Sequence, residues 1–135
     1  MEDLGIDEEP TPIGNLALQT LAMPADTNPS GDVFGGWLMS QMDLAGSILA
    51  QDIAKGRITT VSVGSMHFLR PVCVGAIVSC YADAIDIGRS SITVRVCVWM
   101  KPPTCEDRVK VTECEFVFVA IDNNGRTRAV PKATV

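Results

Sequence analysis

Residues 35–56 read GGWLMSQMDLAGSILAQDIAKG, and the part from Trp37 onward predicts a single long helix. Lys55 and Gly56 end this stretch with a helix stop signal. Small residues at its centre make the predicted helix slim and apolar around much of its circumference, which is typical of a buried helix. Its larger apolar residues recur at spacings of three and four, as on one helix face, at Trp37, Leu38, Met42, Ala45, Ile48, Leu49 and Ile53.

Strand-like segments lie on both sides of this helix. One precedes it at residues 15–21 and is followed by a loop rich in Pro, Asn, Asp and Gly. Consecutive long strands with tight turns between them favour an antiparallel sheet. We therefore predict an α+β fold, with a five-stranded antiparallel sheet wrapped around one long central helix. The four later strands are expected at residues 59–68, 76–87, 91–100 and 109–121.

One helix is too small to cover a sheet of five long strands. The apolar surface that remains, and the exposed sheet edges, need a partner. A homodimer or a higher oligomer is therefore expected. The chain of 135 residues is long enough for one domain, which we place at residues 15–132.

The net charge of −5 comes from the start of the chain, where five acidic residues precede Pro10. This composition predicts a disordered acidic tail at residues 1–14. The rest of the chain is neutral and has no basic stripe, which argues against a nucleic-acid partner. We find neither an apolar run of the roughly 18–20 residues that cross a membrane nor a secretory signal, and therefore expect a cytoplasmic protein that does not bind membranes.

The cysteine and histidine content argues against metal and redox chemistry. The five cysteines, at positions 73, 80, 97, 105 and 114, contain no C-x-x-C pair, and His67 is the single histidine. We expect no metal site and interpret the cysteines as structural, small apolar side chains. His67 falls within a predicted strand, where packing or surface exposure is a simpler role for it than catalysis.

Two features of the helix stretch point to chemistry. Gly35 and Gly36 precede the helix, where bare backbone amides favour an anion or a polarised carbonyl oxygen. The alternative is that the glycines only let the chain turn into a crowded helix. Asp43 is a carboxylate in the middle of an apolar helix, which suits a general base or nucleophile, although an exposed helix face would also explain it.

The spacing of these two features bears on where an active site can form. Seven residues separate Gly36 from Asp43, so both lie on one helix face. At 1.5 Å per residue they are roughly 10 Å apart along the axis, too far to act on the same carbonyl from one chain. If both are catalytic, two helices packed antiparallel across a dimer share the site.

Residues 21–28 (LAMPADTN) and 31–43 (GDVFGGWLMSQMD) resemble the hotdog-fold acyl-CoA thioesterases of the YciA type. Further matches lie at residues 68–72 (FLRPV), 88–91 (GRSS) and 119–122 (VAID). The similarity extends from about Leu18 to Lys132. It implies the hotdog fold and the hydrolysis of acyl-CoA thioesters to CoA and free acid. It also implies a homodimer that assembles into a hexamer, a trimer of dimers, with no cofactor beyond the substrate.

The resemblance also implies roles for particular residues. The family's catalytic helix aspartate falls on Asp43, and its helix-entry glycine, whose amide polarises the thioester carbonyl, falls on Gly35 or Gly36 of the facing subunit. The polar loop residue falls on Asn28, with Asp32 as a further helper. CoA contacts fall on Thr60, Val61, Ser62, Arg89, Ser90, Ser91, Arg126 and Lys132.

The carboxylate would act in one of two ways, by deprotonating a water or by attacking the thioester to give a mixed anhydride. Gly64 stands where related sequences often carry an acidic residue, which leaves the preferred acyl chain open. A non-catalytic acyl-CoA-binding module is the main alternative. A hotdog enoyl- or hydroxyacyl-thioester hydratase is a second, because residues 26–29 match the start of a D-x-N-P-x-H motif, but the histidine of that motif is missing.

Overall fold

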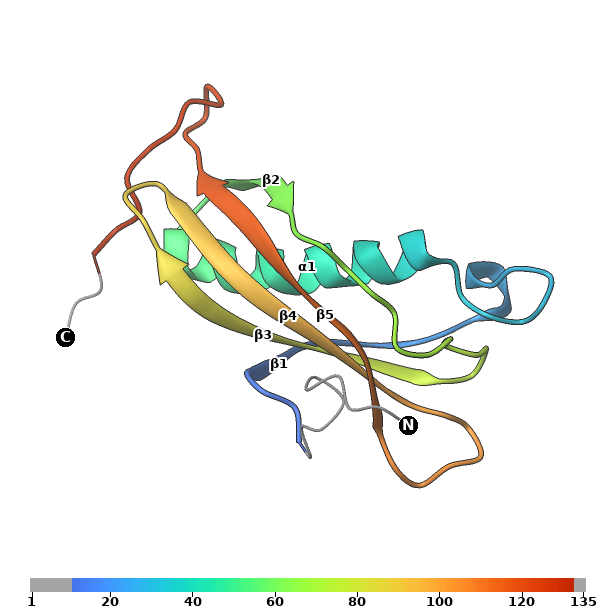
Figure 1. Ribbon diagram of the computed structural model, residues 1–135. Helices are drawn as coiled ribbons and strands as arrows, with labels where there is room; N and C mark the ends of the chain where they lie inside the picture. The colour runs from blue at the N-terminus through green and yellow to red at the C-terminus, as the bar shows by residue number, and fades with distance from the viewer. Residues whose placement is uncertain (1–10, 133–135) are drawn as a thin grey trace.

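One long helix lies across a five-stranded sheet in the computed structural model, which describes residues 11–132 (Figure 1). The one strand, one helix and four strands expected from the sequence are confirmed. The predicted acidic tail lies largely outside the described residues. Along the chain, the elements are β1 (Asn15–Leu21), the short 3₁₀ helix η2 (Pro24–Asp26), α1 (Gly35–Ala54), β2 (Ile58–Val63), β3 (Ile77–Ile87), β4 (Ser91–Lys101) and β5 (Val109–Ala120).

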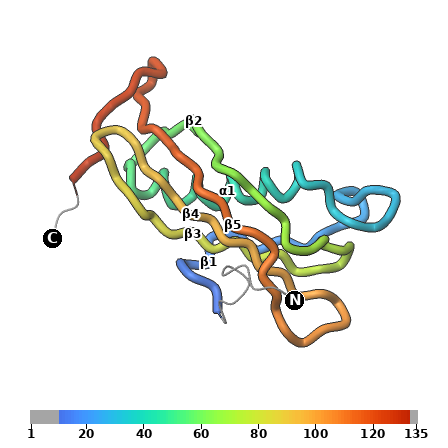
Figure 2. Tube along the Cα trace, viewed as in Figure 1, coloured from blue at the N-terminus to red at the C-terminus, as the bar shows by residue number. Residues whose placement is uncertain are grey.

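The sheet is antiparallel throughout, as predicted, and its strand order is β1-β3-β4-β5-β2. The two strands that flank α1 in the sequence, β1 and β2, therefore lie at opposite edges. The chain must cross the whole sheet between them, and α1 makes that crossing on one face (Figure 2). This topology brings β2 close to the helix, which matters for the site below.

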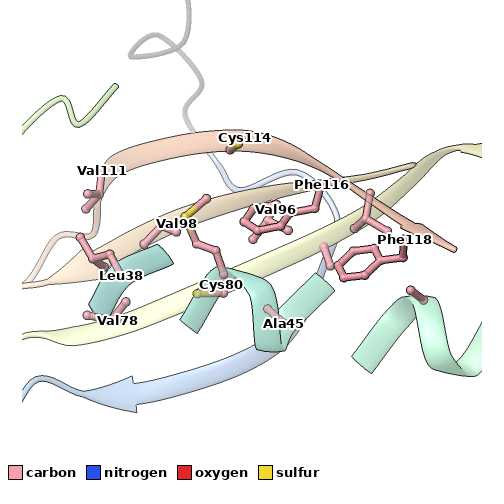
Figure 3. Packing of buried hydrophobic residues seen from close by; sticks show 14 of the residues in the cluster. Leu38, Ala45, Val78, Cys80, Val96, Val98, Val111, Cys114, Phe116 and Phe118 are labelled. Atoms are coloured by element: carbon pink, nitrogen blue, oxygen red, sulfur yellow. The ribbon is translucent and has the colours of Figure 1, made fainter. Parts of the chain in front are cut away.

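The core lies between α1 and the inner face of the sheet. Leu38 and Ala45 of the helix point toward alternate side chains of β3, β4 and β5 (Figure 3). Phe116 and Phe118 are fully buried there, with ring centroids 6.2 Å apart. The helix lies close to the sheet at Gly46, where a Cβ atom would lie 2.9 Å from Cζ of Phe118. The small residues noted in the sequence thus make room for aromatic rings.

The outer side of the helix carries apolar side chains that the protomer does not bury. Met39, Leu44 and Ile48 are 41%, 54% and 51% exposed. Val61 and Val63 on the edge strand β2 are also exposed. Exposed apolar residues on adjacent elements favour contact with another molecule, consistent with the expectation that one helix leaves apolar surface uncovered.

The predicted strand at residues 59–68 is too long. Strand β2 ends at Val63, and the amide of Gly64 donates a hydrogen bond of 2.9 Å to the carbonyl of Glu115 on β5. Beyond that point the regular ladder stops, and only separate contacts with β5 remain: the amide of Leu69 donates to the carbonyl of Val111 at 2.8 Å, and the hydroxyl of Thr112 donates to the carbonyl of His67 at 2.7 Å. His67 is exposed and lies on this irregular segment, not in a strand.

Three of the five cysteines, Cys80, Cys97 and Cys114, are buried, and all five are free thiols. Burial raises the pKa of the Cys80 thiol from 9.0 to about 12. This environment favours the neutral thiol, a small apolar group. Cys105 differs because it is exposed on the loop between β4 and β5.

The close approach of Gly46 to Phe118 predicts a coupled effect on stability. We expect Gly46→Val to lower the free energy of unfolding by about 1–3 kcal/mol, because the added atoms overpack the core. In a Phe118→Leu background the same change costs less, since the ring that it meets is gone. Urea unfolding at equal protein concentrations measures both, with Ser47→Val as the control. An equal cost in both backgrounds would show that the ring is not what Gly46 accommodates.

Cysteine burial predicts selective labelling. At pH 8 iodoacetamide should modify Cys105 in the native protein and leave Cys80 unmodified until the chain unfolds, as read by peptide mass mapping. Because the pKa of Cys80 is raised on folding, the unfolded thiol ionises first as pH rises. The stability linked to this group is therefore fully present below about pH 9 and is lost as pH rises toward 12. Equal labelling rates for the two cysteines in native protein would contradict this assignment.

Candidate functional site

Asp43 lies near the middle of α1 and is half-buried. The hydroxyl of Thr60 on β2 donates a hydrogen bond of 2.7 Å to Oδ1 of Asp43. This contact crosses from the helix to the edge strand and limits the orientation of the Asp43 carboxyl group, because hydrogen bonds are directional. The sequence analysis expected Thr60 to contact CoA, and its link to the carboxylate was missed.

A cavity of about 250 Å³ opens beside Asp43. The helix contributes four residues at spacings of three and four, so the cavity follows one helix face for about two turns. The expectation that Gly36 and Asp43 share a face is thereby confirmed. The cavity is lined by Gly36, Met39, Ser40 and Asp43 from α1, Val63 from β2 and Phe116 from β5.

The glycine pair opens α1 without a side-chain cap. Phe34 is the N-cap residue and makes no capping hydrogen bond through its side chain. A Cβ atom on Gly36 would meet nothing within 4 Å, and one on Gly35 would make an ordinary contact of 3.4 Å with Phe68. Crowding within the protomer therefore does not require either glycine. The exposed first turn presents amides that have no partner inside the helix, which suits an oxygen carrying negative charge.

Asn28 organises the loop that leads into α1. Its Oδ1 accepts hydrogen bonds from the backbone amides of Ser30, at 2.9 Å, and Asp32, at 3.2 Å. The amide group of Asn28 is therefore oriented by its oxygen, and its Nδ2 has no hydrogen-bond partner among residues 11–132. Within one protomer Asn28 lies in the loop before the helix and Asp43 two turns into it.

A larger cavity, of about 860 Å³, lies at the opposite end of α1. Lys55, Arg89 and Lys132 contribute three cationic side chains to its lining, and Asp52 contributes one carboxylate. The C-terminal segment runs beside the β3–β4 turn, as Figures 1 and 2 show, and the amide of Val130 donates to the carbonyl of Arg89 at 2.7 Å. This contact brings the two predicted cations, Arg89 and Lys132, to one cavity.

The remaining predicted CoA contacts are dispersed. Arg126 does not line the large cavity: it is exposed in the turn after β5, where its backbone amide donates to Oδ1 of Asp122 at 3.0 Å. Val61 and Ser62 are exposed on β2. Lys55 was missed as a candidate because the sequence marked it only as a helix stop. It adopts the left-handed conformation, with φ of 55°, where the chain turns out of the helix.

Residues 11–132 hold no group of three His, Cys, Asp or Glu side chains placed to bind a metal ion. In the same part of the chain, no helix has both the length and the apolar character needed to cross a membrane.

Known proteins resemble this chain in sequence and in structure. The acyl-CoA thioester hydrolase YciA of Escherichia coli is 54% identical over 123 residues, which are 89% of this chain and 93% of that protein. A hexameric thioesterase from Yersinia pestis is 53% identical, with a TM-score of 0.87 over 91% of this chain and all of the other. An acyl-CoA hydrolase from Staphylococcus aureus, solved with butyryl coenzyme A and coenzyme A, is 30% identical, with a TM-score of 0.78 over 84% of this chain and 70% of that chain.

The family comparison agrees with these likenesses and with the geometry of the fold. Residues 30–106, which include α1, β2, β3 and β4, match the model of one family. The match covers more than half of the chain, and the hotdog fold expected from the resemblance is confirmed by the solved structures. The chain therefore belongs to the thioesterase superfamily.

Proposed function

We propose that this protein hydrolyses acyl-CoA thioesters to coenzyme A and a carboxylic acid. The observation that carries the proposal is a half-buried carboxylate, Asp43, held by Thr60 at 2.7 Å beside a cavity with apolar walls. Such an arrangement presents one oriented charge to a substrate with an apolar group. The relatives named as acyl-CoA thioester hydrolases support the substrate class.

Asp43 provides the base or the nucleophile of the reaction. As a base, it takes a proton from a water whose oxygen bonds to the thioester carbonyl carbon. The carbon–sulfur bond then breaks, and the CoA thiolate leaves and takes up a proton. As a nucleophile, Asp43 itself forms the bond to the carbonyl carbon, the carbon–sulfur bond breaks and the CoA thiolate leaves, and water later hydrolyses the mixed anhydride to the acid and the free Asp43 carboxyl group. Thr60 fixes the carboxylate in either case, because its hydroxyl hydrogen is directed at Oδ1.

The developing negative charge on the carbonyl oxygen needs donors that Asp43's own helix turn does not supply. The amides of Gly35 and Gly36 are exposed to such an oxygen, but they lie about 10–12 Å from Asp43 along the helix axis, and Asn28 lies in the loop before the helix. We infer that these donors come from a facing subunit, whose helix packs antiparallel on the exposed apolar side of α1. A preorganised donor of this kind contributes about 3–4 kcal/mol to the lowering of the activation barrier.

The three cations around the large cavity would bind the phosphates of CoA. Lys55, Arg89 and Lys132 approach it from the helix end, the β3–β4 turn and the C-terminal segment. Phosphate oxygens are strong acceptors for such charged donors. We further propose a homodimer assembled into a hexamer, which the hexameric Yersinia pestis relative supports. The substrate thioester itself supplies the CoA, and no other cofactor is part of the proposal.

Two alternatives use the same fold. A non-catalytic acyl-CoA-binding module needs the cationic cavity but not an oriented carboxylate, so the Thr60–Asp43 bond favours the enzyme. A hydratase has less support, because His67 is exposed on the segment after β2 and does not line the cavity beside Asp43.

Replacing the carboxylate should abolish most of the activity. We expect Asp43→Asn to lower kcat for CoA release by about 100-fold or more, since the amide neither accepts the proton nor attacks carbon. The assay is thiol release from acyl-CoAs between acetyl and palmitoyl. Asp86→Asn is the matched control, because it makes the same change of a carboxylate to an amide at an exposed position on β3. If the wild type binds CoA but releases none from any substrate, the binding module replaces the enzyme.

The Thr60 hydroxyl should act through Asp43. Thr60→Val keeps the side-chain shape and removes the donor, so we expect kcat to fall about tenfold, with Thr60→Ser restoring most of it. An unchanged kcat in Thr60→Val would remove Thr60 from the mechanism.

Removing a cation from the large cavity should weaken the binding only of substrates that carry phosphates. We expect Arg89→Ala or Lys55→Ala to raise KM for an acyl-CoA about tenfold, equivalent to about 1.4 kcal/mol. Neither should change kcat/KM for the corresponding acyl thioester of N-acetylcysteamine, which lacks phosphates. Arg108→Ala, at an exposed arginine on the β4–β5 loop, is the control. A rise in KM for both kinds of substrate would show that these cations do not act by binding the phosphates of CoA.

A further inference from the structure

The cavity beside Asp43 has a carboxylate at one position and apolar side chains over the rest of its walls. Its lining contains no cation, and its other polar side chain, Ser40, already donates its hydroxyl to the carbonyl of Trp37 at 2.7 Å. A hollow of this kind suits an apolar group next to a reacting centre. We propose that it holds the acyl group of the substrate and that Met39 sets the acyl chain length accepted, an inference that rests on the proposed function.

Met39 stands where an acyl chain must pass. It precedes Asp43 by four residues on the same helix face, which places it about 6 Å along the axis toward Gly36. A chain attached to a carbonyl carbon at Asp43 and directed along the cavity meets Met39 before it reaches the helix entry. Side chains at this spacing on a helix are neighbours.

The other walls are less able to adjust. Phe116 is fully buried and stacked against Phe118, so the core fixes the floor of the cavity. Val63 is β-branched and has one stiff side-chain torsion. Met39, by contrast, is unbranched and 41% exposed, and core packing does not restrict it. Of the apolar lining residues, it is therefore the one whose shape can limit or admit a longer chain.

The size of the cavity sets the direction of the effect. At about 250 Å³, the part supplied by one protomer is smaller than the roughly 300–1,000 Å³ of pockets for drug-sized ligands. Truncating Met39 enlarges it, and a bulkier ring shortens it. Each additional methylene that becomes buried should favour a longer substrate about fourfold.

The test is the chain-length profile of kcat/KM over the acyl-CoA series from acetyl to palmitoyl. For Met39→Ala we expect the optimum to move to longer chains, with the ratio of long- to short-chain kcat/KM rising about tenfold or more. Met39→Phe should move the optimum to shorter chains. Met23→Ala is the matched control, because Met23 is 51% exposed and does not line the cavity. Two variants with opposite expected shifts keep the test decisive if one of them folds poorly.

The outcomes separate this inference from the proposed function. If the wild type releases no CoA from any substrate, the proposed function fails. If the wild type is active but the folded Met39 variants keep its profile, or shift it no more than Met23→Ala does, the assignment of Met39 is wrong and the proposed function stands. Opposite shifts for Met39→Ala and Met39→Phe would support the inference.

Discussion

The close packing of α1 against the inner face of the sheet is the contact on which the rest of the molecule depends. Buried aromatic rings on β5 need space, and Gly46 provides it where any larger residue would meet Phe118. Because the helix lies that near, its face toward β2 also comes within reach of the edge strand. A hydrogen bond between Thr60 and Asp43 becomes possible only in this arrangement.

The same packing divides the molecule into two functional ends. The loop before α1, which carries Asn28, enters the helix at one end (Figure 1). The cations of the large cavity line the other end of the helix. Asp43 lies between them, on the side of α1 that the sheet does not fully cover. The apolar side chains that remain exposed near it, such as Leu44, favour a second subunit that would complete the site.

The local pattern of the chain predicted most of the fold. Strands were recognised from β-rich runs and turns, and α1 from residues repeating every three or four positions. The prediction failed after Val63, where the regular pairing with β5 ends and only separate hydrogen bonds to that strand continue. The length of a strand at a sheet edge depends on which backbone groups of the neighbouring strand are in position to form hydrogen bonds with it. That neighbouring strand is distant in the sequence. His67 was placed in a strand for this reason.

By itself, the sequence determined that this chain is an α+β domain with one apolar helix that bears a carboxylate, Asp43, near its middle, and that its motifs resemble those of thioesterases. These conclusions rest on residue type and spacing, which are local. Only the tertiary structure decided that Thr60 orients Asp43, that Lys55 joins Arg89 and Lys132, and that Arg126 does not. Each of these contacts joins segments that are far apart in the chain. The path of the backbone across the sheet determines which segments come into contact.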